Sequence, residues 1–206
     1  MSLRISVLGS GSGGNCTLVA TERTRLLVDA GFSRRDTLRR LAAIGETCDS
    51  IDAILITHEH SDHVSGLLSL TKAFGKDRPV PVFITEITRQ SLLLDADAVL
   101  PPFEFIQPGR RFMIGDIEVD AFTIPHDAAD PVAFSFCAGG LRAAVCMDLG
   151  YVPESVKHQL HGCRVLVLES NHDLEMLKVG PYPWHIKQRV MSRTGHLSNL
   201  DRKSVV

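Results

Sequence analysis

The sequence predicts a single α+β domain in which helices cover layered sheets. Its 206 residues are enough for one domain with a sizeable core, and its 44% hydrophobic and 22% charged content is typical of globular chains. Short β-rich runs alternate with segments of helical periodicity, and no repeat, low-complexity tract or linker divides the chain. We therefore expect one domain over residues 1–206.

Composition and charge exclude several classes of protein. No window approaches eighteen apolar residues and no secretory signal opens the chain, so we expect a cytoplasmic protein without a membrane partner. The formal net charge of -2 gives no global attraction for nucleic acid, which would have to meet a local basic patch. The five cysteines include no C-x-x-C pair, which argues for reduced thiols rather than disulfides or a cysteine-rich zinc site.

The first half of the chain predicts a β-hairpin followed by strand and helix units. Gly9, Gly11 and Gly14 match the dinucleotide pattern G-x-G-x-x-G, but β-formers follow them where phosphate binding needs a helix N-terminus. A hairpin between a strand at 3–8 and a strand from Cys16 fits better. The later elements expected here are strands at 26–29, 51–57 and 79–85 and helices at 34–44, 62–74 and 86–94, with Gly75 after the second helix.

The second half predicts strands at 117–124, 132–137, 141–147 and 165–168, with a helix at 153–161. Polar residues follow several of these strands directly. His126 comes after the first, Asp148 after the third, and Glu169-Ser-Asn-His-Asp after the last. Each residue alone is as typical of a turn as of a site, so only their convergence on one place would make them functional.

The strongest signal is the run His58-Glu59-His60-Ser61-Asp62-His63 at the end of an apolar strand. Imidazole and carboxylate groups are ligands for Zn²⁺, Mn²⁺ and Fe²⁺, and a loop can turn alternate side chains toward one point. The run is not the helical H-E-x-x-H motif. The alternative is a polar surface loop, which the density of metal-competent residues argues against.

These residues resemble the metallo-β-lactamase family, whose fold is an αββα four-layer sandwich. The resemblance rests on T-H-x-H-x-D-H, on Leu-Val-Asp29-Ala-Gly before it, and on Pro125-His126-Asp127 and Asp148-Leu-Gly-Tyr after it. Gly-Ser-Gly-Gly-Asn-Cys, the Asn171-His172-Asp173 run and Gly-His196-Leu-Ser-Asn are similar to the YycJ/WalJ-type subgroup. The resemblance covers nearly the whole chain.

The resemblance implies a hydrolase with two divalent ions, Zn²⁺, Mn²⁺ or Fe²⁺, that activate a water as nucleophile. One ion would be held by His58, His60 and His126, and the other by Asp62 and His63, with Asp148 bridging both. Asp29 would orient the histidine loop through hydrogen bonds.

The same resemblance implies a phosphodiesterase that degrades DNA exonucleolytically and holds the phosphate backbone. Asp62 would accept the proton of the water, and His196 would contact the phosphate or protonate the leaving oxygen. Asn171 and His172 would contact substrate phosphate, or instead form a turn that caps the next helix. His196 has the alternative of an ordinary loop histidine.

The chain departs from the subgroup at its C-terminal part, which we expect to be shortened and the sandwich incomplete there. It stops at Val206, before the run in which the subgroup supplies a further histidine to the second ion, and residues 200–206 are unlike the helix expected there. His196 or His172 would be the substitutes at hand. An uncovered sheet edge would also allow a second copy of the chain to pair with it, which would give a homo-oligomer.

Two other functions therefore stay open. The same ions would serve a thioester or lactone hydrolase, although the basic residues near His196 fit phosphate better. A catalytically impaired nucleic-acid-binding or regulatory protein would keep the fold and lack the second ion.

Two basic stretches and one aromatic pair are candidates for holding nucleic acid. The first stretch is a solvated helix face or a phosphate contact, and the second surrounds His196. Tyr182 and Trp184 lie between prolines and would either stack on a base or pack as a rigid turn on the core. The basic residues are Arg34, Arg35, Arg39 and Arg40 in the first stretch and Lys187, Arg189, Arg193, Arg202 and Lys203 in the second.

Overall fold

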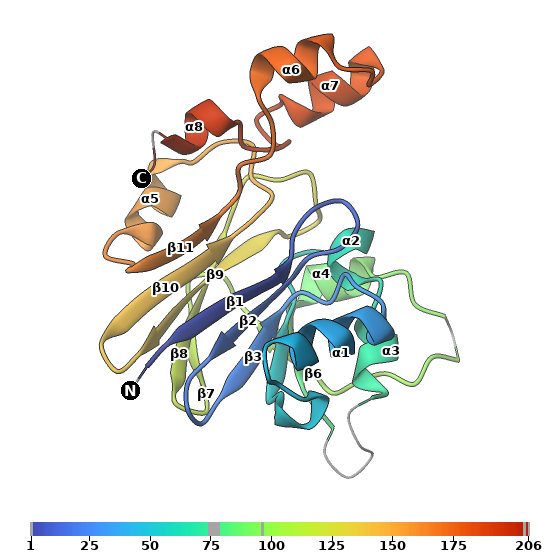
Figure 1. The fold of residues 1–206 in the computed structure, drawn as a ribbon, viewed down its shortest axis with the longest axis vertical. Coiled ribbons are helices and arrows are strands. Elements are labelled where there is room, and N and C mark those ends of the chain that lie inside the picture. The colour runs from blue at the N-terminus through green and yellow to red at the C-terminus, as the bar shows by residue number, and fades with distance from the viewer. Residues whose placement is uncertain (1, 74–78, 96, 204, 206) are drawn as a thin grey trace.

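Two β-sheets packed face to face form the centre of the molecule (Figure 1). The computed structural model describes residues 2–73, 79–95, 97–203 and 205. The first sheet has the strand order β1-β2-β3-β4-β5-β6, and the second has the order β11-β10-β9-β8-β7. Within the described residues, no helix is long and apolar enough to cross a bilayer.

The first sheet begins as an antiparallel hairpin and continues as parallel strands. The β1–β2 and β2–β3 pairs are antiparallel, whereas β3, β4, β5 and β6 run parallel. Parallel strands place their C-terminal ends at one edge of the sheet, which gathers the loops that follow them. The strands span Arg4–Gly9, Cys16–Ala20, Arg25–Val28, Ala53–Leu55, Val82–Thr85 and Phe103–Ile106.

The second sheet is antiparallel from β7 to β10, and β11 joins its edge parallel to β10. The turn Gly139-Gly140 connects β9 to β10 as the sequence predicts, with φ of 56° and 77° that favour glycine. The strands span Arg111–Ile114, Ile117–Thr123, Val132–Ala138, Leu141–Cys146 and Val165–Leu168.

Three apolar clusters hold the layers together and confirm the αββα arrangement. Inward-facing residues such as Leu55 and Phe134 fill the space between the sheets. Leu41 and Leu70 pack helices α1 (Arg34–Ala43) and α3 (Leu67–Thr71) on the outer face of the first sheet. Val156 and Leu160 pack α5 (Glu154–Leu160) on the outer face of the second.

The prediction of one continuous helix at 62–74 is wrong. The helix forms as α2 (Ser61–Val64) and α3, with Gly66 between them, and its expected end at Phe74 and Gly75 lies outside the described residues. A Cβ on Gly66 would lie 1.7 Å from the carbonyl oxygen of Phe32, so the backbone turns where it passes that loop. The helix expected at 86–94 is the shorter α4 (Glu86–Ser91), and a short 3-10 helix spans Cys48–Ser50.

The expectation that residues 200–206 are not helical is wrong for their first part. Helix α8 spans Asn199–Lys203. The hydroxyl of Ser198 accepts a hydrogen bond from the amide of Asp201 at 3.1 Å and donates to its carboxylate at 2.6 Å. A side-chain acceptor at this place satisfies an amide that a helix start leaves without a partner, which stabilises the short helix.

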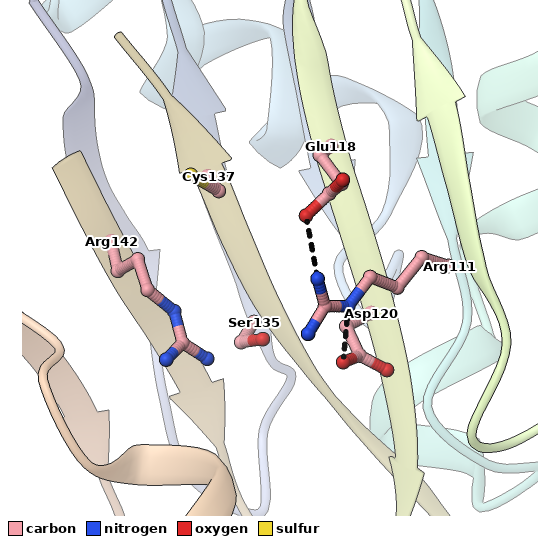
Figure 2. Close-up of a pocket in the computed structure, with 6 residues that line it drawn as sticks. All are labelled: Arg111, Glu118, Asp120, Ser135, Cys137 and Arg142. Atoms are coloured by element: carbon pink, nitrogen blue, oxygen red, sulfur yellow. Dashed lines mark hydrogen bonds and ion pairs between the residues drawn. The ribbon is translucent and has the colours of Figure 1, made fainter. Parts of the chain in front are cut away.

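The outer face of the second sheet has a polar hollow beside the part covered by α5 (Figure 2). It encloses about 200 Å³. Arg111 approaches both Glu118 and Asp120, at 3.4 Å and 3.3 Å. Arg142 is engaged with carbonyl oxygens of Gln159 and His161 at the end of α5. The hollow has two basic and two acidic side chains, so its charges balance. It lies along the strands of the sheet and not at the strand ends that precede His126 and Asp148. The lining residues are Arg111, Glu118, Asp120, Ser135, Cys137 and Arg142.

Candidate metal centre and active-site cleft

The candidate site lies where loops leave the C-terminal ends of strands in both sheets. His58 follows β4 by three residues, His126 follows β8 by three, and Asp148 follows β10 by two. Two carboxylates at these ends have left-handed backbone, Asp29 with φ of 64° and Asp148 with φ of 53°. Such strained backbone persists only where surrounding contacts hold it, and it clusters at functional sites.

Three of the predicted ligands form one compact group. Donor atoms of His58, His60 and His126 all lie within 4.8 Å of one another. Nε2 of His58 is buried and has no hydrogen-bond partner within the described part of the chain. A buried imidazole nitrogen without a partner is costly in a folded protein, and a divalent cation would satisfy it. The donor set thus fits a metal ion.

A second group shares His58 with the first and adds His63 and Asp148, again within 4.8 Å. Nε2 of His63 lies 2.6 Å from one carboxylate oxygen of Asp148, and the same oxygen lies 3.8 Å from Nε2 of His58. Asp62 is more loosely placed, with its carboxylate 3.6 Å from Nε2 of His63. The structure therefore brings together all six predicted metal ligands, with Asp148 between the two histidine groups.

Asp29 makes the contact that the resemblance implies. Its carboxylate lies 2.7 Å from Nδ1 of His63 and accepts hydrogen bonds from the amide and hydroxyl of Thr57, both at 2.9 Å. The Thr57 hydroxyl also lies 3.0 Å from Nδ1 of His58. These bonds turn Nε2 of both histidines away from the core and toward the site.

Asn15 is a positioning residue that the sequence did not single out. Its amide nitrogen donates to the Asp62 carboxylate at 3.1 Å, and its side-chain oxygen accepts from the amide of Gly11 at 3.0 Å. Its backbone amide donates to the Asp62 carbonyl at 2.7 Å. The only signal for it was its place in the Gly-Ser-Gly-Gly-Asn-Cys run, which does not show where the amide points.

The loop that carries the histidines passes close to the Asp29 loop. A Cβ on Gly31 would lie 1.7 Å from the carbonyl oxygen of Asp62, so only glycine permits this approach. The amide of Ala30 donates to the carbonyl of His63 at 2.8 Å, and that of Gly66 donates to the carbonyl of Ala30 at 2.8 Å. The metal-binding loop is therefore held by backbone contacts as well as by side chains.

Burial and neighbouring charges lower the pKa of some histidines at the site and raise the pKa of others. Burial and the neighbouring His63 lower the pKa of His58 to about 2, and burial also lowers the pKa of His126. A neutral imidazole is the form that ligates a metal. Burial opposes protonation of His63 too, but the carboxylates of Asp29 and Asp148 raise its pKa to about 10. Burial works against the charged form of Asp148, yet hydrogen bonds from His196 and His63 hold its pKa well below its usual range.

Glu169 is the second functional candidate that sequence reasoning missed. Nδ1 of His196 lies 2.6 Å from one of its carboxylate oxygens and 3.2 Å from Asp148. The other oxygen of Glu169 accepts from the amides of Leu149 and Leu197, at 3.0 Å and 3.1 Å. Burial opposes the charge on His196, but its bonds to Asp148 and Glu169 raise its pKa to about 10. Because these contacts engage Nδ1, Nε2 is the nitrogen of His196 that stays available to a substrate in the cleft.

A cleft of about 410 Å³ opens between the β1–β2 loop and the segment after β11. Asn171 lines the cleft, as its predicted role requires. His172 is not among the lining residues, and both of its ring nitrogens are buried without a partner in the described chain. The rest of the lining comes from Ser10, Gly11, Ser12, Asn15, Asp62, Met147, Asp148, Val167, Leu168, Glu169, Ser170 and His196.

The basic residues near His196 are engaged with the protein. Lys187 is buried and donates to the carbonyl of Lys178 at 2.7 Å, and Nε of Arg189 donates to Asp127 at 2.6 Å. Arg193 lies over the ring of Tyr151. Their charge contributes to the field around the site, but these contacts fix where the side chains lie.

Comparison with known proteins agrees with this geometry. The family model described as a β-lactamase superfamily domain matches residues 24–201. An exodeoxyribonuclease YycJ of Bacillus anthracis is 39% identical over 98% of this chain and 75% of its own length. An exodeoxyribonuclease WalJ of Streptococcus pneumoniae is 35% identical over 98% of this chain and 74% of its own.

Solved structures show the same fold at lower sequence identity. The metallo-β-lactamase fold protein YhfI of Bacillus subtilis superposes with a TM-score of 0.76 at 18% identity, covering 98% of this chain and 80% of that one. Zn²⁺-bound PqqB of Methylobacterium extorquens gives 0.70 at 21% identity, covering 94% and 80%. The fold and the histidine and aspartate groups support the use of a divalent metal. The chain belongs to the β-lactamase superfamily, in the group of the YycJ and WalJ exodeoxyribonucleases, and is a metal-dependent hydrolase.

Proposed function

We propose that this protein is a DNA exonuclease that hydrolyses phosphodiester bonds in the cleft between the β1–β2 loop and the segment after β11. The observation that best supports a phosphodiesterase is the placement of the Glu169 and His196 pair beside Asp148, in the same cleft as Asp62. The relatives named exodeoxyribonuclease match 98% of the chain and support DNA as the substrate.

Two divalent ions, Zn²⁺, Mn²⁺ or Fe²⁺, are proposed to bind here. His58, His60 and His126 would hold one and Asp62 and His63 the other, with Asp148 shared. When bound, such a pair supplies a water of lowered pKa and offsets charge on the phosphoryl oxygens.

The protein's own groups do the remaining work. Asp62, held by the amide of Asn15, accepts a proton from the attacking water. His196, fixed through Nδ1 by Glu169, donates a proton from Nε2 to the departing sugar oxygen. Asn171, which lines the cleft, is proposed to contact a phosphate that flanks the cleaved bond. His172, whose ring nitrogens are buried, is proposed to support the loop that carries Asn171 rather than to contact phosphate itself.

End-labelled DNA would test the proposal. The protein, loaded in turn with Mn²⁺, Zn²⁺ and Fe²⁺, should shorten single-stranded or duplex DNA from an end, and His60→Ala should abolish the shortening. His158→Ala removes an exposed histidine on α5 and serves as the matched control, with wild-type activity expected.

Other outcomes would select other functions. Binding of DNA in a mobility-shift assay without shortening in any metal would favour the impaired binding or regulatory protein. Hydrolysis of a thioester or lactone that His60→Ala abolishes, with DNA left intact, would favour the acyl hydrolase. Either result would overturn the nuclease proposal.

A further inference from the structure

Residues 173–194 form an excursion that leaves the rim of the cleft and returns to it. Its two ends are joined by the bridge between His172 and Ser198, and the amide of Asn171 donates to the carbonyl of Leu197 at 2.9 Å. The excursion contains α6 (Leu174–Val179) and α7 (Trp184–Val190), which stand off the sandwich in Figure 1. The cleft is therefore the place where this helical pair is anchored.

The turn between the two helices exposes aromatic side chains. Tyr182 and Trp184 are each 60% exposed, so the expectation that they pack as a turn on the core is wrong. Pro181 and Pro183 beside them restrict the backbone of the turn that carries the rings. Two aromatic rings gathered in one exposed turn are a candidate interaction site.

The segment that carries these rings has no acidic side chain. From Pro181 to Arg193 the sequence has the basic residues Lys187, Arg189 and Arg193 and no acidic residue, although the chain carries a formal net charge of -2. The ion pair between Arg189 and Asp127 ties α7 to the residue that follows His126. A polyanion that continues from the cleft along α7 therefore meets no acidic side chain of this segment that would repel it.

The length of α7 sets how far Trp184 lies from the end of the helix that contacts His196. The carbonyl of Val190, at the end of α7, accepts from the amide of His196 at 2.9 Å. Trp184 begins the helix, and six steps of about 1.5 Å place it about 9 Å from that end. Stacked nucleotides spaced by about 3.4 Å would cover this distance in about three residues of the strand.

We propose that Tyr182 and Trp184 form a stacking platform for the bases of a single-stranded nucleic acid whose end lies in the cleft. The platform would meet bases a few nucleotides away from the end that lies in the cleft. This inference rests on the proposed nuclease function and adds to it a contact with bases, in addition to phosphates. A second copy of the chain is a poorer occupant, because a stable interface buries about 800 Å² on each partner. The two rings together with the exposed Met176 and Val179 of α6 are only four side chains.

Trp184 is the sole tryptophan of the chain, so its intrinsic fluorescence reports on the platform alone. The test uses the His60→Ala protein, which should not shorten the strand, titrated with oligothymidylates of two to ten nucleotides. A chain of abasic phosphodiesters of equal length is the control ligand. We expect saturable quenching by strands of about four nucleotides or more, and little quenching by dinucleotides or the abasic chain.

Substitutions in the same background separate stacking from folding. Trp184→Ala should weaken binding of a fluorescently labelled decathymidylate about fivefold or more, as loss of a base–aromatic stack does. Trp184→Phe should restore most of the affinity because it keeps an aromatic face. Leu200→Ala removes another side chain that is 60% exposed, on α8, and should leave the affinity unchanged.

Several results would overturn the platform. Binding of the labelled strand without any change in Trp184 fluorescence, or equal affinity for the abasic chain, would reject it while the nuclease function stands. A fluorescence change that follows protein concentration without DNA would identify self-association instead. If the wild-type protein neither binds nor shortens nucleic acid, the proposed function fails, and the platform fails with it.

Discussion

The Glu169 carboxylate and the His196 imidazole lie 2.6 Å apart at the edge of the cleft. Glu169 is held in turn by two backbone amides, so the pair is rigid on its buried side. Because the carboxylate fixes Nδ1 of His196, it also fixes the direction in which Nε2 faces the substrate.

Glu169→Gln should therefore lower kcat for DNA shortening about 100-fold or more, since a misplaced acid loses most of its catalytic contribution. The variant keeps the volume of the side chain, and metal content per chain, measured alongside kcat, separates lost proton transfer from lost ions. Glu154→Gln, at a side chain that is 87% exposed, is the control. A Glu169→Gln protein with wild-type kcat would remove His196 from its proposed role.

Asp29→Asn should weaken metal binding about 10- to 100-fold, because outer contacts of a ligand histidine contribute by that amount. The neutral amide weakens the hold on Nδ1 of His63 and on Thr57. Competition with a chromophoric chelator would measure the affinity. Asp36→Asn on α1 is a control of the same chemistry outside the site, and equal affinities in the two variants would contradict the orienting role.

Gly31→Ala should destabilise the fold by about 3 kcal/mol or more, because its Cβ would overlap the carbonyl oxygen of Asp62 and neither backbone has room to move. Gly13→Ala is a close control, since nothing lies within 4 Å of a Cβ at that position. Urea denaturation of both variants measures the free energy of unfolding. Similar losses in the two would show that the approach of the loops is not tight.

Glu46 gives a dependence of stability on pH that does not involve the site. Its buried carboxylate forms ion pairs with Arg4 and with Arg25, the latter at 2.7 Å. Burial alone would raise the pKa of Glu46, but the hydrogen bonds from Arg25 and Arg4 lower it below its ordinary value of 4.5. The folded protein therefore binds this proton more weakly than the unfolded chain does, and the stabilisation is present above the unfolded pKa and lost as pH falls through the folded one.

Glu46→Gln should accordingly cost about 1–2 kcal/mol at pH 7, allowing for the partial exposure of both arginines. The difference in unfolding free energy between wild type and variant should shrink below pH 4.5. Denaturant titrations at pH 7 and in mild acid would measure it. A difference that stays constant with pH would assign the effect to packing.

Apolar strands and the residues after them were the most predictable features. The run at 165–168 became β11 with the same bounds, since a short, β-branched apolar run bounded by polar residues is typical of a strand. Likewise His126 and Asp148 were recognisable because each closely follows the end of a strand. Helix α1 followed from its apolar spacing, and the structure adds a cap in which the side chain of Ser33 accepts from the amide of Asp36.

Features that depend on distant contacts were not predictable. Gly66 divides a helix because it passes the Phe32 carbonyl, which is far away in sequence. Strands β6 and β7 are short, and each has a single buried residue, Ile106 and Ile114, so no apolar run marked them in the sequence. Glu169 was one of five polar residues after β11, and only the fold shows that it is the one whose carboxylate is buried beside His196.

The two sheets contribute different halves of the donor set. His58, His60 and His63 belong to the first sheet and its loops, whereas His126 and Asp148 extend from the second. An ion held between them acts as a cross-link between layers that otherwise meet through apolar packing. Binding to the folded state alone adds RT ln(1 + [M]/Kd) to stability, so the melting temperature should rise with free metal and fall with chelator. We therefore expect metal supply to affect the stability of the contact between the two sheets as well as turnover.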